Sequence, residues 1–265
     1  MQLPDYWLQR PPGDIDDATR RAFDELLDAA LASAGSPVID YRLSAPRWQF
    51  LCHVADHHGL ALHGSGNSEI ARFEPRQAND LNEFGRQRAV YAASDGLWAM
   101  FFAIVDRDRF SLSVANACVR LADAAGRFSD PYYYFSVSQA ALPHRPWRNG
   151  TVYLLPPTTF AQQPPMAFGG SQVHIAQLAS LEAVVPLGAW PSPPRTSPSC
   201  SRLAATTTPA CPSMRRRCKR AGRCRKDERG MTPRSGSGAW PTRAHGGDEL
   251  RPVDQALHRD GGQGR

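Results

Sequence analysis

The sequence predicts an α+β fold with a mostly antiparallel sheet, preceded by helices and followed by a disordered C-terminal tail. Three observations lead to this prediction. Apolar residues recur at helical spacing only in the first 105 residues. Short runs rich in aromatic and β-branched residues follow, separated by turn-forming clusters. All Phe and Tyr residues then stop before residue 190. Helices early and strands late are typical of an α+β domain.

Composition divides the chain near residue 190. Residues 1–190 carry 15 Arg, no Lys and 19 acidic residues, whereas residues 191–265 carry 16 basic and 6 acidic residues. The second part also holds only three Leu, one Val and no Ile, too few apolar side chains to build a core. We therefore expect an arm with an amphipathic helix over residues 1–36, a folded domain over 37–190 and a disordered basic tail over 191–265.

Three helices are expected in the first part of the chain. The first begins at Asp16, has acidic residues in its first turn and a single apolar stripe, and stops at Gly35. The second occupies about residues 44–59. The third follows Ser94 or Asp95 as its N-cap and is apolar almost all round, which predicts a central, buried position.

Extended segments are expected at residues 60–65, 89–93, 110–121, 132–138, 150–156, 172–175 and around 183–187. Between the first two lies a mostly polar loop, in which Ile70 and Phe73 are the expected anchors. Loops of this length inside a domain are usually functional or mobile. The sequence therefore points to this region as the place of a site.

Three of these segments carry a resemblance to a known family. They are LHGS at 62–65, GxxxxVYAASD at 85–95 and SQVHIAQLASLEAVVPL at 171–187. Together they resemble the core segments of the ADP-ribosyltransferase fold, in the poly(ADP-ribose) polymerase and diphtheria-toxin branch, which is known for a His-Tyr-Glu signature. The resemblance covers about residues 60–187. It implies an ADP-ribosyltransferase-like fold whose substrate is NAD.

The resemblance implies a binding role for five residues. His63 would hydrogen-bond a ribose hydroxyl of NAD, the backbone of Gly64 would hold the nicotinamide amide, and Ser65 completes the same motif. Tyr91 and Phe102, eleven residues apart, would clamp the nicotinamide ring between them. Stacking of this kind contributes about 0.5–1.5 kcal/mol per ring beyond the buried area.

The catalytic glutamate of the family is replaced in this chain. Its position corresponds to Ser171 or Gln172, so the expected catalytic set is His63, Tyr91 and Gln172. Cleavage of NAD builds positive charge on the ribose, which a carboxylate stabilises and a glutamine does not. Two function classes follow: a weak ADP-ribosyltransferase acting on an unknown macromolecular acceptor, or an inactive nucleotide-binding or protein-interaction module.

Structural roles stay open for the same residues. A histidine at the end of an apolar strand is often a hydrogen-bonded structural residue, and Phe102 alone fits a helix core. The group of His53, His57 and His58 is expected to form a solvated helix face, because no third ligand accompanies the helical pair His53 and His57. We therefore expect no metal cofactor.

No feature of the sequence predicts a membrane partner. Apolar runs fall short of the ~18 residues that a membrane span needs, and the first residues, MQLPDYWLQRPPGD, lack the layout of a signal peptide. Of six cysteines, only Cys52 and Cys118 fall in the expected domain, which fits a reducing compartment. These observations favour a cytoplasmic protein.

The basic tail has two interpretations. Its run RRRCKRAGRCRK at 215–226 permits salt-sensitive binding of nucleic acid, a partner expected only through this tail. Against this, apolar patterning stops abruptly after Trp190, and the absence of Lys from residues 1–190 suggests a GC-rich gene. We favour the interpretation that residues 191–265 are a frameshifted or otherwise non-native terminus.

Overall fold

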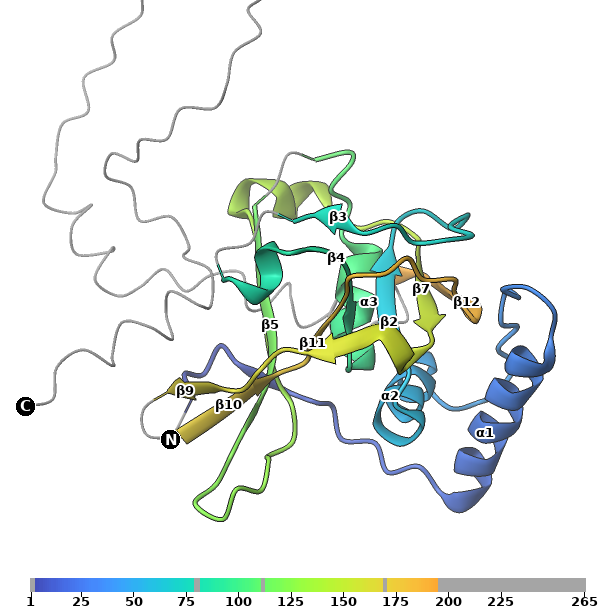
Figure 1. The fold of residues 1–265 in the computed structure, drawn as a ribbon, viewed down its shortest axis with the longest axis horizontal. Helices are drawn as coiled ribbons and strands as arrows, with labels where there is room; N and C mark the ends of the chain where they lie inside the picture. Colours follow the sequence, from blue (N-terminus) through green and yellow to red (C-terminus); the bar gives the residue numbers. More distant parts are fainter. Residues whose placement is uncertain (1–2, 79–81, 111–112, 169–170, 195–265) are drawn as a thin grey trace, which may run out of the picture. The chain divides into compact units, whose positions relative to one another are not determined.

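In a computed structural model of the chain, the structure describes residues 3–78, 82–110, 113–168 and 171–194. Three α-helices and two antiparallel sheets make up this part (Figure 1). The predicted combination of helices and a mostly antiparallel sheet is therefore confirmed. Residues 195–265 lie outside the described residues, so the predictions of a disordered, basic or non-native tail stay predictions.

Although the first helix ends before Gly35 and the second begins only after Pro46, the structure contains the three helices that the sequence predicts. They are α1 (Asp17–Ala32), α2 (Arg47–His58) and α3 (Gly96–Ile104). Asp16 caps α1 by accepting a hydrogen bond from Thr19 N at 2.7 Å. Gly59 ends α2 in the left-handed conformation, with φ of 63°. Local chemistry therefore sets these boundaries.

Each sheet is built from strands that are distant in the sequence. The first sheet has the order β1 (Leu8–Gln9), β6 (Tyr132–Val137), β5 (Val114–Leu121), β10 (Ser171–Ile175) and β9 (Met166–Phe168). The second has the order β12 (Gly188–Ser192), β7 (Gly150–Leu155), β2 (Ala61–Ser65), β4 (Arg88–Ala93), β11 (Gln177–Ser180) and β8 (Phe160–Gln162), with β3 (Arg76–Gln77) paired to β4. Short 3-10 turns lie at Phe84–Arg86, Gln139–His144 and Pro157–Thr159.

Two predicted segments differ from the structure. The N-terminal arm, for which no strand was expected, contains β1, which pairs with β6. The strand expected around residues 183–187 is wrong: Val184 makes only an isolated bridge to Phe73, and the strands are β11 before it and β12 after it. Pro186 lacks the N–H that a central strand needs. β12 ends at Ser192, two residues past the expected domain boundary.

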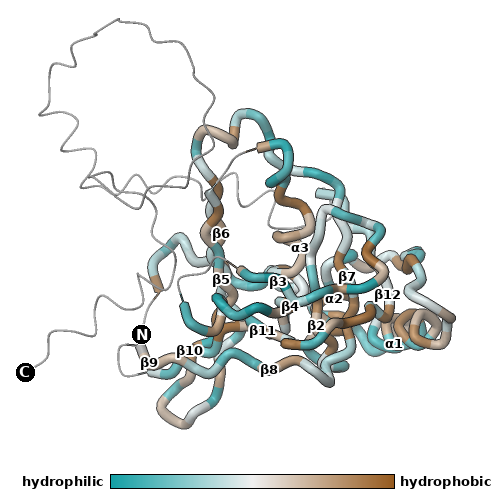
Figure 2. Tube along the Cα trace, turned by 45° about the horizontal axis from the view of Figure 1, so that its top comes forward, coloured by the Kyte–Doolittle hydropathy of each residue, from teal (hydrophilic) through white to brown (hydrophobic). Residues whose placement is uncertain are grey.

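The helix α3 lies against β2 and β7 and is buried on nearly all sides. Its trace is mostly apolar in Figure 2. Two glycines let the backbones approach closely. A Cβ on Gly64 would lie 2.0 Å from Ala99 O, and a Cβ on Gly150 would lie 1.9 Å from Ala103 O. No side chain fits between helix and sheet at these points.

The remaining core continues from α3 to the outer helices. Phe23 and Leu27 of α1 pack with Phe50 of α2, whose ring stacks on Trp190 of β12 with centroids 4.5 Å apart. The predicted loop anchor Phe73 is buried in a second, smaller cluster, against which Ile70 packs. Within the described residues, no helix has the length and apolarity to cross a membrane.

Replacing Gly150 with Ala should destabilise the domain, because the added methyl group would overlap a backbone carbonyl that cannot rotate away. We expect the free energy of unfolding to fall by about 1–3 kcal/mol in chemical denaturation. The matched control is Gly188→Ala, whose Cβ would meet Ile39 Cδ1 at 3.4 Å and Pro37 O at 3.6 Å, which are ordinary contact distances. Equal stability of the two variants would contradict the close packing of α3.

Candidate functional site

A cavity of about 690 Å³ lies beside β2, β4, α3 and β5. Five of the six residues that the sequence predicts for a site line it: His63, Gly64, Ser65, Tyr91 and Phe102. They come from two strands and a helix that are neighbours in the fold, because β2 pairs with β4 and α3 packs on β2. The structure thus brings these five residues to one place.

His63 is a neutral histidine with one nitrogen available to a ligand. Its Nδ1 lies 2.6 Å from the backbone oxygen of Tyr91. A carbonyl oxygen can only accept, so Nδ1 carries the proton and Nε2 keeps its lone pair. Burial lowers the pKa of His63 below its ordinary value, which favours the uncharged ring. Nε2 has no hydrogen-bond partner among the described residues and can accept from a hydroxyl group.

Tyr91 and Phe102 are held in place by different contacts. The Tyr91 hydroxyl lies 3.0 Å from Phe84 O and 2.9 Å from Gln87 O, so its single proton is shared between the two carbonyls of a 3-10 turn. Phe102 is half-buried, with its ring 5.8 Å from the ring of Trp98. Both rings therefore have fixed positions at the cavity wall.

Gly64 and Ser65 have structural reasons of their own. Gly64 is required by the close approach of α3, whatever its backbone does for a ligand. The Ser65 hydroxyl accepts a hydrogen bond from Asn67 N at 3.1 Å, which shapes the turn after β2. The structural role of Gly64 and a binding role are compatible, because its missing side chain faces the helix.

Gln172 does not lie with the other predicted residues, and its placement at the site needs correction. It is exposed on β10, where it pairs with Ala167 of β9 in the first sheet. The chain enters the second sheet only after Ile175. Gln177, the first residue of β11, and Gln163 line the cavity instead. Which glutamine reaches the cavity depends on strand pairing, which the sequence motif does not indicate.

The cavity wall carries positive charge and no acidic side chain among the described residues that line it. Arg107 is exposed and has no ion pair among the described residues. Arg148 forms ion pairs with Asp108 and, at 4.0 Å, with Asp106. Sequence reasoning missed both arginines, and also the cavity residues Trp98, Asn116, Gln163 and Gln177. Only Trp98 had a signal, as part of the apolar helix.

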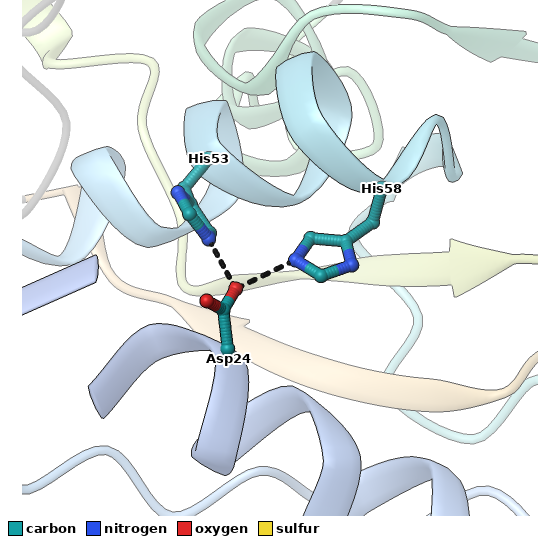
Figure 3. Close-up of side chains that lie close together, drawn as sticks. All are labelled: Asp24, His53 and His58. Carbon is teal, nitrogen blue, oxygen red and sulfur yellow. Dashed lines mark hydrogen bonds and ion pairs between the residues drawn. The ribbon is translucent and has the colours of Figure 1, made fainter. Parts of the chain in front are cut away.

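A second cluster of polar side chains joins α1 to α2. Asp24 Oδ1 lies 2.7 Å from His53 Nε2 and 2.8 Å from His58 Nε2, and Figure 3 shows the three side chains converging. His53 is buried, so the prediction of a wholly solvated histidine face is wrong. The third possible ligand that the sequence did not reveal is Asp24, which lies on another helix.

Two imidazoles and a carboxylate form a donor set that zinc accepts, and the three ligand atoms lie within 4.8 Å of one another. The second nitrogen of His53, Nδ1, is buried without a partner among the described residues. A histidine bound to metal normally donates that N–H to an acceptor. The contacts therefore favour a hydrogen-bonded link between helices, in which each Nε2–H donates to Asp24.

Comparison with protein-family models, with curated proteins and with solved structures gives no match. Function is therefore inferred from the geometry and chemistry of the cavity. The cavity offers a neutral histidine with a free lone pair, three aromatic side chains, two arginines and several amides.

Replacing Asp24 with Asn should destabilise the chain at neutral pH, because hydrogen bonds from His53, then His58, lower the pKa of the Asp24 carboxyl. A carboxyl whose pKa is lower in the folded state stabilises that state above its unfolded pKa, about 3.9. This contribution is lost as the pH falls through the folded pKa.

The measurement is chemical denaturation of both proteins between pH 7 and pH 2.5. We expect the difference in unfolding free energy to be present at pH 7 and to disappear at the acidic end. Asp28→Asn, at an exposed position of the same helix, is the control and should leave stability unchanged. A difference that does not depend on pH would show that the charge of Asp24 has no role.

Proposed function

We propose that the cavity binds NAD and that the domain is a nucleotide-binding module with little or no ADP-ribosyl transfer activity. One observation carries the proposal. The residues His63, Gly64, Ser65, Tyr91 and Phe102, which resemble the NAD site of the ADP-ribosyltransferase family, line one cavity whose described wall holds no Asp or Glu. The five residues in one cavity support NAD binding, and a described wall without a carboxylate argues against efficient catalysis.

The size and lining of the cavity suit a nucleotide. Ligand pockets commonly enclose about 300–1,000 Å³, and this one is within that range. Tyr91 and Phe102 offer flat faces to a nicotinamide ring, and His63 Nε2 can accept a hydrogen bond from a ribose hydroxyl. Arg107 provides positive charge for a diphosphate. The charge of Arg148 is partly neutralised by its ion pairs with Asp106 and Asp108.

The same lining opposes the bond cleavage that an active transferase needs. Loss of nicotinamide leaves positive charge on the ribose, and a fixed carboxylate would stabilise that charge. The charged side chains on the described wall are both cations, and His63 is neutral. Binding interactions that do not strengthen in the transition state give affinity without rate. A transferase acting on a macromolecular acceptor would need a carboxylate from elsewhere.

Tyr91→Ala should weaken NAD binding, because the substitution removes one stacking face while the β4 backbone remains paired. The loss should be about 1–3 kcal/mol, the range found when a base loses an aromatic partner. Isothermal titration calorimetry of the full chain measures it. Tyr6→Ala, at a residue that does not line the cavity, is the control and should bind as the unmodified chain does. If Tyr91→Ala binds NAD with unchanged affinity, Tyr91 does not stack on the nicotinamide ring.

Gln177→Glu should raise the rate of NAD cleavage, because it places a carboxylate on the cavity wall, where the ribose would become positive. We expect the cleavage rate to rise about tenfold. One well-aligned electrostatic group in an enzyme contributes a hundredfold or more, and an introduced side chain is less well aligned. Release of nicotinamide from labelled NAD is the measurement. Gln172→Glu makes the same chemical change outside the cavity and should leave the rate unchanged.

Two results would count against this account of the chemistry. Rapid cleavage by the unmodified chain would mean that a carboxylate is already present at the reacting sugar. If Gln172→Glu raises the cleavage rate as much as Gln177→Glu does, the location of the carboxylate on the cavity wall does not explain the increase.

A further inference from the structure

Asn116 is a cavity residue whose side-chain orientation is fixed by its neighbour. It lies on β5, half-buried, and its Oδ1 is 2.7 Å from Nε1 of Trp98. An indole N–H can only donate, so the atom of Asn116 that faces it must be the carbonyl oxygen. The amide group of Asn116 therefore has one possible orientation, with its NH₂ directed away from Trp98.

Trp98 is itself held firmly, so the orientation of Asn116 is set in advance of binding. The backbone N–H of Trp98, in the first turn of α3, donates to the Asp95 cap at 2.9 Å, and its ring is buried in the core. The Asn116 NH₂ has no hydrogen-bond partner among the described residues, and it is not among their buried unpaired polar atoms. The two N–H donors of the Asn116 amide are thus held at the cavity wall, where a ligand can accept from them.

We propose that Asn116 is a specificity-determining residue, whose NH₂ donates to an acceptor oxygen of the bound nucleotide. This inference rests on the proposed function and extends it to a residue that the sequence motifs did not include. A phosphate oxygen and the carboxamide oxygen of nicotinamide share the required acceptor chemistry. A ligand that presents a donor at this point would leave two N–H groups unpaired and would be rejected.

A purely structural role would not need an amide at this position. To hold Trp98, residue 116 needs only an acceptor oxygen, which aspartate offers in the same shape. Aspartate would, however, replace the NH₂ with a second acceptor, and that oxygen would repel a ligand oxygen. Asn116→Asp therefore separates support of Trp98 from recognition of the ligand.

The test compares the full-length chain with Asn116→Asp in thermal unfolding and in calorimetric titration with NAD. We expect a similar melting temperature and NAD affinity at least tenfold weaker. Gln9→Glu makes the same amide-to-carboxylate change on β1, outside the cavity, and should bind NAD as the unmodified chain does. If Asn116→Asp does not fold, Asn116→Ala takes its place and should also weaken binding.

Separate titrations with ADP-ribose and with nicotinamide identify the acceptor. If the Asn116 variants lose affinity only for ADP-ribose, the acceptor oxygen belongs to the phosphates or ribose. If they lose affinity for nicotinamide, it is the carboxamide oxygen. If the unmodified chain binds NAD and the Asn116 variants bind it equally well, this inference is overturned and the proposed function stands. If the folded, unmodified chain does not bind NAD, the proposed function fails and this inference fails with it.

Discussion

The close contact between α3 and the second sheet determines where the cavity residues lie. Gly64 of β2 and Gly150 of β7 have no side chains to hold the helix away, so its backbone rests directly on theirs. Since the helix is apolar on nearly all sides, burial contributes most to fixing its position. Its residues Trp98 and Phe102 are brought to the cavity by this packing. Glycine at residue 64 is therefore needed for the fold before any ligand is considered.

The start of α3 depends on one buried carboxylate, Asp95. It accepts from Trp98 N at 2.9 Å and from the Tyr133 hydroxyl at 2.8 Å, and it pairs with Arg10 at 2.7 Å. A carboxylate that is 2% exposed is costly unless such partners satisfy it. Burial, and next the charge of Asp95, raises the pKa of Tyr133, so the hydroxyl stays protonated and remains a donor. The N-terminal arm, β6 and α3 meet at this one group.

Sequence reasoning succeeded where the determining signal is local and failed where it is distant. The helix caps at Asp16 and Asp95 and the stop at Gly59 act within a few residues, so the sequence predicted these three helix ends. The HGS and VYAASD motifs lie on paired strands, which explains why five residues of the candidate site could be anticipated. Gln172 was misplaced because β10 and β11 join different sheets, and only long-range pairing shows which residues of this segment reach the cavity. The contact of Asp24 with His53 likewise joins two helices and leaves no pattern in the sequence.

The electrostatics of the cavity separate binding from catalysis. Burial lowers the pKa of His63, so its ring is uncharged near pH 7 and does not add a third cation. Because Tyr91 O accepts from Nδ1, the nitrogen left as an acceptor is Nε2. In the proposed complex with NAD, the attraction of Arg107 and Arg148 for a phosphate group would be the same before and after the bond to nicotinamide begins to break. Rate enhancement requires a group that interacts more strongly with the developing positive charge than with the intact nucleotide. The described wall offers amides in that role, from Asn116, Gln163 and Gln177, and an amide dipole stabilises a cation less than a carboxylate does. This lining therefore supports the proposal that the cavity binds a nucleotide without cleaving it efficiently.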